Sequence, residues 1–287
     1  MSVQCSAMIG KILKQLGLCQ TPLAVTRFPH EEGDGFYNAW RVDFSEASYV
    51  LKQVKGKESE IYSRFLNKPC IFAPQQMAVT SFDQENYLLM EYISGCSMMK
   101  PKRKDLLLSI DSLIAMQSGF WNTNMESNAL ESRINRGKYL ADSRLERAYA
   151  AYLEDCACIP TALCHDDLLP FNVILSHDRA VFIDWEVGGI LPYTASIARL
   201  FAHADEQEDA FFQMKETDKV YALEYYYARF LKDRGVAYDS FLHSFKLALF
   251  YEYCEWVYVG NKYADTENDR FHSYFQKATE MAIKLGF

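Results

Sequence analysis

Hydrophobic and polar residues alternate in the first third of the chain, and a period of two residues is typical of β-strands with one buried face. Short polar segments separate the alternating stretches, with Ser45 and Glu46 between the first two and residues 83–86 between the last two. Strands joined by such short turns pair in an antiparallel manner. We therefore expect a small antiparallel sheet built from residues 36–44, 47–54, 76–82 and 87–93.

Apolar residues that recur every three to four positions predict helices in the rest of the chain. A helix over residues 56–67 would place Ile61 and Tyr62 on one face, and a short amphipathic helix is expected over residues 8–18. Beyond residue 100 the helical spacing dominates. It predicts helices over residues 105–120, 194–203, 218–232, 240–259 and 270–285, with one or two more within 127–153. A sheet followed by mostly helical chain predicts the α+β class.

One segment in the middle of the chain interrupts the helices. Residues 161–164 form a short apolar stretch that predicts a buried strand, and two further apolar runs cover residues 171–175 and 180–183. The polar residues 176–179 between these runs predict a small hairpin. Such a hairpin would carry Asn172 and Asp184 to one end of neighbouring strands.

Length, composition and charge narrow the possible functions. The chain has 287 residues, enough for one large domain or two lobes, and its net charge of −8 with no basic stripe argues against a nucleic-acid partner. No stretch reaches the roughly 18 uninterrupted apolar residues of a membrane span. The N-terminus does not resemble a signal peptide, and the eight cysteines show no zinc-ligand spacing. We expect a cytoplasmic protein with reduced cysteines.

The hairpin region also contains the residues with the clearest chemistry. His165, Asp167 and Asn172 form an H-x-D-x-x-x-x-N arrangement, and Asp184 follows the second apolar run. Phosphoryl transfer from a metal-bound nucleotide requires a carboxylate to accept the proton of the attacking hydroxyl, and oxygen ligands for Mg²⁺. Asp167 would be that base, while Asn172 and Asp184 would be metal ligands. Metal is needed because two like charges 4 Å apart repel by roughly 4 kcal/mol at an effective dielectric constant of about 20.

This segment resembles the catalytic and metal-binding loops of the aminoglycoside phosphotransferase and choline kinase superfamily. The second motif of these small-molecule kinases is similar to Ile183–Asp184–Trp185–Glu186. The resemblance implies a protein-kinase-like fold with a nucleotide-binding lobe over residues 1–93 and a helical lobe over residues 94–287. It also implies ATP or GTP with Mg²⁺, and a catalytic loop containing His165 and Asp167. Two positions depart from the family pattern: Asp166 replaces a Gly, and Ser196 replaces an Asp.

The N-terminal segments contain residues that a kinase needs beside the phosphates. Gly33 and Gly35 precede the first strand and allow close backbone approach to a phosphate, although a plain hairpin turn explains them as well. Asn38 occupies a position at which members of the family often have an asparagine. Lys52 lies in a strand and would pair with Glu58 on the following helix, with Glu60 as the second choice. The alternative is an edge-strand lysine that reaches solvent.

The last strand of the sheet resembles the hinge of the family, which binds the adenine ring through backbone groups. Met90, Glu91 and Ile93 are the hinge positions that the resemblance indicates. The alternative is that this segment is only the last strand of the sheet.

The phosphate acceptor is harder to infer. Aromatic and acidic side chains together hold amines through cation–π attraction and charge, which suggests a site for choline, another amino alcohol or an aminoglycoside. The candidate substrate residues are Glu186, Glu252, Glu255 and Trp256. The alternative is that the aromatic residues form the core and the glutamates face water.

Three functional classes remain from the sequence. The first is an active small-molecule kinase that acts on a small alcohol, and the second is a catalytically silent kinase-like binding protein. Protein-kinase activity is disfavoured, because no A-P-E-like segment occurs and little room for an activation loop remains between Asp184 and the helix near Thr194.

Overall fold

The computed structural model describes residues 3–30, 33–54, 57–124, 131–208 and 210–287. By packing, the chain divides into two compact units. The first unit contains residues 1–97 and 171–188, and the second contains residues 98–170 and 189–287. The sequence assigned residues 171–188 to the helical lobe, whereas they pack with the first unit. The predicted lobe limits at residues 93 and 94 themselves stay a prediction.

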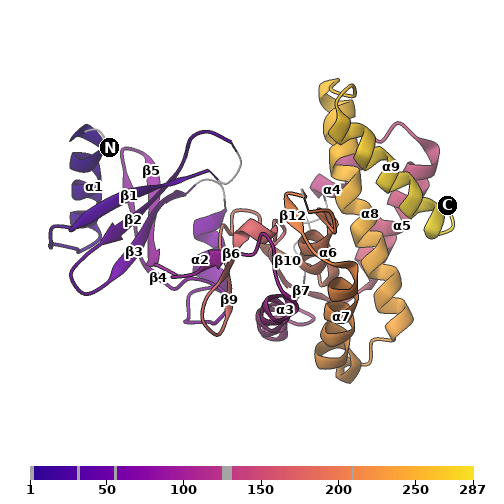
Figure 1. Cartoon of the computed structure of the whole chain (residues 1–287), viewed down its shortest axis with the longest axis horizontal. Helices are drawn as coiled ribbons and strands as arrows, with labels where there is room; N and C mark the ends of the chain where they lie inside the picture. Colours follow the sequence, from indigo (N-terminus) through magenta and orange to yellow (C-terminus); the bar gives the residue numbers. More distant parts are fainter. Residues whose placement is uncertain (1–2, 31–32, 55–56, 125–130, 209) are drawn as a thin grey trace. The chain divides into compact units, whose positions relative to one another are not determined.

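The first unit is built on a five-stranded antiparallel sheet in the order β1-β2-β3-β5-β4, labelled in Figure 1. Its strands are β1 (Ala24–Pro29), β2 (Phe36–Asp43), β3 (Ser48–Val54), β4 (Gln76–Phe82) and β5 (Glu85–Glu91). The four strands expected from alternation are present, while β1 was not predicted. Its burial is irregular and it ends in a proline, so its sequence has no clear period of two.

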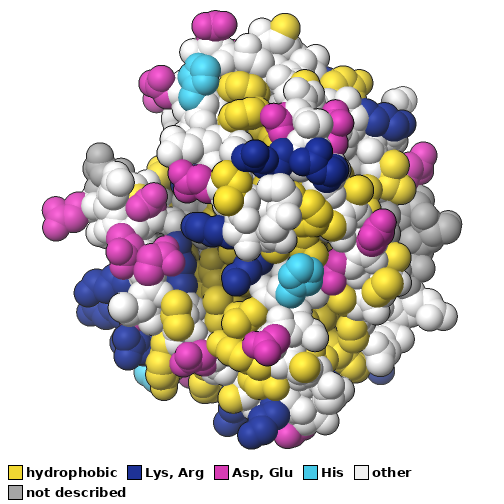
Figure 2. Space-filling model, turned by 90° about the vertical axis from the view of Figure 1, so that its right-hand side faces the viewer, with side chains coloured by type: hydrophobic (Ala, Val, Ile, Leu, Met, Phe, Trp, Pro, Cys, Tyr) yellow, Lys and Arg dark blue, Asp and Glu magenta, His cyan; other side chains and the backbone are white. Residues whose placement is uncertain are grey.

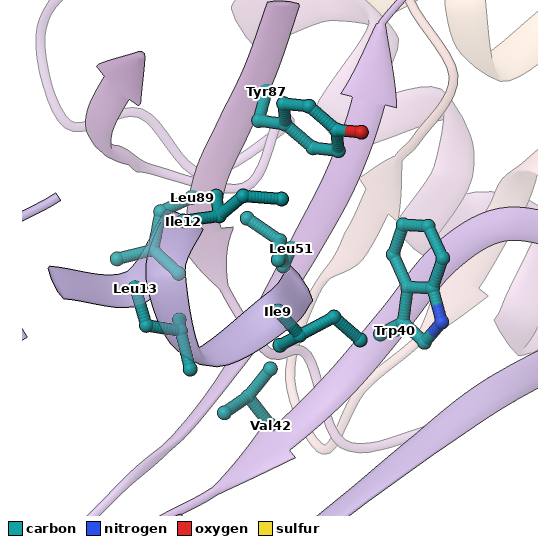
Figure 3. Close-up of a cluster of buried hydrophobic side chains, with 8 residues drawn as sticks. All are labelled: Ile9, Ile12, Leu13, Trp40, Val42, Leu51, Tyr87 and Leu89. Carbon is teal, nitrogen blue, oxygen red and sulfur yellow. The ribbon is translucent and has the colours of Figure 1, made fainter. Parts of the chain in front are cut away.

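Helix α1 (Val3–Gln15) packs on one face of this sheet. Figure 3 shows Ile9, Ile12 and Leu13 of α1 directed toward the strands. The strand side of this cluster consists of Trp40, Val42, Leu51, Tyr87 and Leu89. Because side chains alternate along a strand, the residue after Leu51 is directed to the opposite face. That residue is Lys52, so the packing against α1 leaves Lys52 on the face away from this cluster.

The remaining elements of the first unit are α2 (Glu58–Phe65), β6 (Cys96–Ser97), β8 (Val173–Leu175) and β9 (Ala180–Phe182). Strands β6, β8 and β9 form a small antiparallel sheet in that order, and the β8–β9 pair is the hairpin expected from the sequence. Residue 95, a glycine, lies against β8 so closely that a Cβ atom would meet the Leu175 carbonyl oxygen at 2.3 Å.

The second unit is mainly helical. Its helices are α3 (Arg103–Ser118), α4 (Glu131–Gly137), α5 (Ser143–Cys158), α6 (Thr194–Ala202), α7 (Glu216–Tyr226), α8 (Tyr238–Tyr263) and α9 (Asp269–Lys284). Shorter turns are η2 (Tyr227–Leu231) and η3 (Lys232–Arg234). A further short turn, η1 (Pro170–Asn172), begins at the last residue of segment 98–170 of the second unit and continues into the first unit, where it leads into β8. Small strand pairs join β7 (Thr161–Cys164) to β10 (Gly189–Pro192) and β11 (Ala204–Asp205) to β12 (Phe212–Gln213).

The fold confirms the predicted α+β, protein-kinase-like class, with an antiparallel sheet first and a helical part after it. On the face shown in Figure 2, acidic and basic side chains are mixed, so the negative net charge does not form one continuous patch there. Within the described residues, no helix is long and apolar enough to cross a membrane.

Candidate active site

In the first unit, Lys52 connects the sheet to both α2 and the end of the β8–β9 hairpin. Its Nζ lies 2.7 Å from Glu58 Oε2 and 2.7 Å from Asp184 Oδ1. Glu58 is the first residue of α2 and its side chain is 2% exposed, whereas the Asp184 side chain is 41% exposed. The lysine therefore has one buried and one accessible carboxylate partner.

Both carboxylates stabilise the charged form of Lys52. Burial disfavours the Lys52 ammonium, but Glu58 and then Asp184 outweigh it and raise the pKa of Lys52. Burial also raises the pKa of Glu58, although Lys52 opposes that shift. The second candidate partner, Glu60, instead pairs with Arg64 on the exposed side of α2. Lys52 therefore pairs with Glu58 and not with Glu60.

Asp184 follows β9 in an unusual backbone conformation. Its φ is +66°, a left-handed value that few residues other than glycine adopt. The next residue, Trp185, is fully buried, and its main-chain N–H donates to Glu58 Oε1 at 3.2 Å while its indole N–H donates to the Phe182 carbonyl at 2.8 Å. These bonds fix the chain on the C-terminal side of Asp184, so the left-handed turn is anchored.

The hairpin brings Asn172 next to Asp184. Val173 pairs with Phe182, and the Ile183 N–H donates to the Asn172 carbonyl at 2.9 Å. Asn172 is buried, and its amide oxygen and the Asp184 carboxylate are both ligand types that Mg²⁺ accepts. No group of three His, Cys, Asp or Glu side chains suited to a metal occurs in the described part of the chain. Mg²⁺ is usually completed by water and phosphate oxygens, so these two residues fit a nucleotide-bound metal.

Both glycines of the predicted phosphate loop have positive φ angles, which favour glycine over other residues. Gly33 has φ +81° and Gly35 has φ +123°, and a Cβ atom on Gly35 would lie 3.0 Å from the His30 ring. The His30 N–H donates to the Gly35 carbonyl at 3.1 Å, which closes the turn. Asn38, on β2, accepts a bond of 2.6 Å from Arg27.

The predicted hinge residues lie at the end of β5. Met90 is buried and pairs with Val50, and Glu91 is the last residue of the strand. Ile93 lies beyond the strand, so the expected strand over residues 87–93 ends earlier than predicted. The Glu91 carboxylate accepts from Arg179 at 3.0 Å.

In the second unit, the loop after β7 contains the predicted catalytic residues. His165 is buried, and its main-chain N–H donates to Ser196 Oγ at 2.8 Å. Ser196 therefore braces this loop where the family pattern has an Asp. Asp166, which replaces the family Gly, has no positive φ and instead accepts from Arg133 at 2.5 Å.

Asp167 has a partner that the sequence analysis missed. Arg199 on α6 donates to Asp167 Oδ1 from Nη2 at 2.7 Å and from Nε at 3.1 Å. Its Nη1 contacts Glu252 at 2.9 Å and Glu255 at 2.6 Å, both on α8. A signal existed in the sequence, because Ser196, Arg199 and His203 occur at spacings of three and four residues and so share one face of a helix.

The predicted substrate residues have the following surroundings. Glu252 is 2% exposed, and burial raises its pKa while Arg199 opposes that shift. Glu255 also pairs with Arg136 of α4. Trp256 is half-buried, with the Arg270 guanidinium 4.4 Å from its ring centroid. Glu186, in the first unit, is exposed.

Each unit therefore gathers a subset of the candidate residues. The first unit brings together Lys52, Glu58, Asn172 and Asp184. The second brings together Asp167, Glu252 and Glu255 around Arg199. Trp256 makes none of these contacts and instead lines a pocket of about 290 Å³ with residues of α9.

Comparison with known proteins identifies similar sequences and folds. Residues 119–230 match the model of a phosphotransferase enzyme family. A segment covering 51% of the chain is 28% identical to protein LicA of Haemophilus influenzae, and 27% identical to LicA of strain Rd of that species. These matches span 42% and 53% of the two relatives, so the chain covers about half of their length.

Solved structures resemble the chain over nearly its whole length. A choline kinase LicA from Streptococcus pneumoniae has a TM-score of 0.65 and 14% identity, covering 97% of this chain and 99% of that one. An amicoumacin kinase has a TM-score of 0.63 and 11% identity, covering 99% and 94%. A choline/ethanolamine kinase family protein from Mesorhizobium loti has a TM-score of 0.62 and 14% identity, covering 97% and 94%. At such identities these matches establish the fold.

Proposed function

We propose that this chain, which matches a phosphotransferase enzyme family over residues 119–230, transfers the γ-phosphate of ATP or GTP to a hydroxyl of a small, amine-bearing molecule. The observation that carries this proposal is the contact of Lys52 with both Glu58 and Asp184 at 2.7 Å. A lysine on a strand, a glutamate on the next helix and an aspartate that holds metal are the parts by which protein-kinase-like enzymes bind a nucleotide.

The first unit would bind the nucleotide. Asn172 and Asp184 would hold Mg²⁺, and Lys52, oriented by Glu58, would donate to the phosphates. When bound, the metal neutralises charge on the phosphate oxygens. Gly33 and Gly35 would let the backbone approach the phosphates, with Asn38 beside them.

The end of β5 would bind the base of the nucleotide. Met90, Glu91 and Ile93 surround the point where the strand ends, and main-chain groups beyond a strand end are open to bond an adenine or guanine ring.

The second unit would contribute the base. Asp167 would orient the acceptor hydroxyl and accept its proton, and His165 would support the loop from the interior. The Ser196 bond to the His165 backbone supports this arrangement, since it ties the loop to α6.

One observation supports an amine-bearing acceptor. Proteins similar to this chain are named a choline kinase and a choline/ethanolamine kinase family protein. Glu186 and Trp256 stay proposed contributors, and a cytoplasmic location stays proposed from the sequence.

A catalytically silent kinase-like binding protein is the competing proposal. It is disfavoured because a suitable residue fills each position for the base, both metal ligands and the phosphate lysine. A silent binder would tolerate the loss of at least one of them.

A phosphorylation screen tests the proposal. The protein would be incubated with Mg²⁺ and ATP or GTP against choline, ethanolamine, homoserine, thiamine, sugars, macrolides and aminoglycosides, with product esters detected by mass spectrometry. We expect one amine-bearing alcohol to be converted. The kinase proposal fails if no acceptor is converted and Mg²⁺–nucleotide produces no thermal shift; a shift without conversion would favour the silent binder.

A further inference from the structure

Arg199 is placed so that its guanidinium bridges the proposed base and two glutamates. Two of its nitrogens, Nε and Nη2, contact Asp167 Oδ1 at 3.1 and 2.7 Å. The third, Nη1, contacts Glu252 Oε2 at 2.9 Å and Glu255 Oε2 at 2.6 Å. The Arg199 side chain is 15% exposed, so most of this planar group lies among protein atoms.

A histidine on the same helix fixes the other side of this arginine. His203 Nε2 lies 3.1 Å from Arg199 Nη1, and its Nδ1 lies 2.5 Å from the Tyr274 hydroxyl. An arginine can only donate, so His203 Nε2 accepts and the ring proton resides on Nδ1. Burial, and then Arg199, lowers the pKa of His203 to about 3, in agreement with a neutral ring.

The contacts of Arg199 are therefore directional. The edge formed by Nε and Nη2 is directed at Asp167, while Nη1 is fixed by Glu252, Glu255 and His203. A planar guanidinium fixed at one nitrogen restricts the position of a carboxylate at its other edge. Asp167 is 32% exposed, and a side chain so accessible needs such a restraint to keep one orientation.

We propose that Arg199 is a positioning residue that fixes the Asp167 carboxylate for phosphoryl transfer, and that Glu252, Glu255 and His203 act through Arg199. This inference rests on the proposed function, in which Asp167 orients the acceptor hydroxyl. It gives the two glutamates a role in which they support the base and need not touch the substrate.

A matched control lies elsewhere in the second unit. Arg103 of α3 donates from Nε to Asp218 Oδ1 at 2.7 Å, and neither residue belongs to the group around Arg199. Arg103→Lys is therefore a matched control for Arg199→Lys. Each change keeps one positive charge beside an aspartate and removes one planar fork.

The test separates turnover from nucleotide binding. For Arg199→Lys we expect kcat to fall about 100-fold, the loss typical of a catalytic group displaced by about 1 Å, with the KM for nucleotide within about twofold of wild type. Arg103→Lys should change kcat by less than about threefold. Added guanidinium should restore part of the activity of Arg199→Ala, because it can occupy the vacated position.

A second measurement does not depend on turnover. In a double-mutant cycle of Arg199→Gln and Asp167→Asn followed by thermal unfolding, residues in direct contact should be non-additive. The shift in Tm of the double variant should be smaller than the sum of the two single shifts. Additive shifts would show that Arg199 does not restrain Asp167.

The outcomes separate the two proposals. If wild-type protein converts an acceptor and Arg199→Lys retains its kcat, or loses no more than Arg103→Lys, the positioning role is wrong while the kinase function stands. If wild-type protein converts no acceptor, the proposed function fails, and the unfolding cycle still decides whether Arg199 restrains Asp167.

Discussion

Replacing Glu58 with glutamine removes the buried partner of Lys52 with little change of shape. The two charges lie 2.7 Å apart, which corresponds to an attraction of about 6 kcal/mol at an effective dielectric constant of about 20. Part of this is offset, because the variant also removes the cost of burying a charged Glu58. Lys52 keeps Asp184 at 2.7 Å, so we expect it to shift toward Asp184 and away from the nucleotide phosphates.

The expected result for Glu58→Gln is a fall in kcat/KM of about 100-fold, equivalent to about 2.7 kcal/mol of transition-state stabilisation. The thermal midpoint should also fall, because a buried ion pair that loses one partner is typically destabilised by about 3–5 kcal/mol. The fall should be smaller than this range implies, since Lys52 keeps Asp184 as a partner. Steady-state kinetics with Mg²⁺–ATP and the acceptor found by screening measures kcat/KM. Thermal unfolding measures the midpoint.

Glu60→Gln is the control for this prediction. Glu60 lies on the same helix, but its carboxylate pairs with Arg64 at the surface, where such pairs contribute roughly 0.3–0.5 kcal/mol. Its kinetics should match wild type. Equal kinetics for Glu58→Gln and wild type would refute the role assigned to the Lys52–Glu58 pair.

Three further predictions concern other parts of the two units. Ser196→Ala should destabilise the fold by about 1–3 kcal/mol in urea unfolding, because the buried N–H of His165 loses its acceptor; an unchanged midpoint would contradict this. His203→Gln should reduce the loss of stability in acid. Burial lowers the pKa of His203 to about 3 in the folded state, below the unfolded value near 6.5. The neutral ring therefore contributes to the free energy of unfolding above pH 6.5, and this contribution falls by about 1.4 kcal/mol for each pH unit below 6.5. Urea unfolding at pH 6.5 and 5 measures this, and equal acid slopes for variant and wild type would argue against a neutral ring. Gly35→Ala should raise the KM for nucleotide several-fold, because φ there is +123°, whereas Gly10→Ala in α1, with open space around it, should leave that KM unchanged.

The fold was largely predictable because local patterns determined most elements. Strand β4 covers the residues that alternation predicted, and β7 covers those of the short apolar stretch. Strand β10 was missed, since its four residues are too few to show a period. Residue 56, the first of the helix expected over 56–67, lies outside the described residues.

The candidate site was predictable only where its residues are close in sequence. Asn172 and Asp184 flank one hairpin, so spacing alone placed them together. Glu58 could be preferred over Glu60 because it shares the apolar face of α2. The contacts of Arg199 form because α6 and α8 meet in the folded chain. Arg199 and Glu252 are 53 residues apart in the sequence, so no local pattern predicts their contact.

The central claim is that this chain transfers phosphate with Asp167 as base. The most direct measurement is the rate of phosphate-ester formation by Asp167→Asn compared with Asp178→Asn, an exposed aspartate in the turn of the β8–β9 hairpin. The account predicts a loss of at least about 100-fold for Asp167→Asn and none for Asp178→Asn. Undiminished ester formation by Asp167→Asn would contradict it.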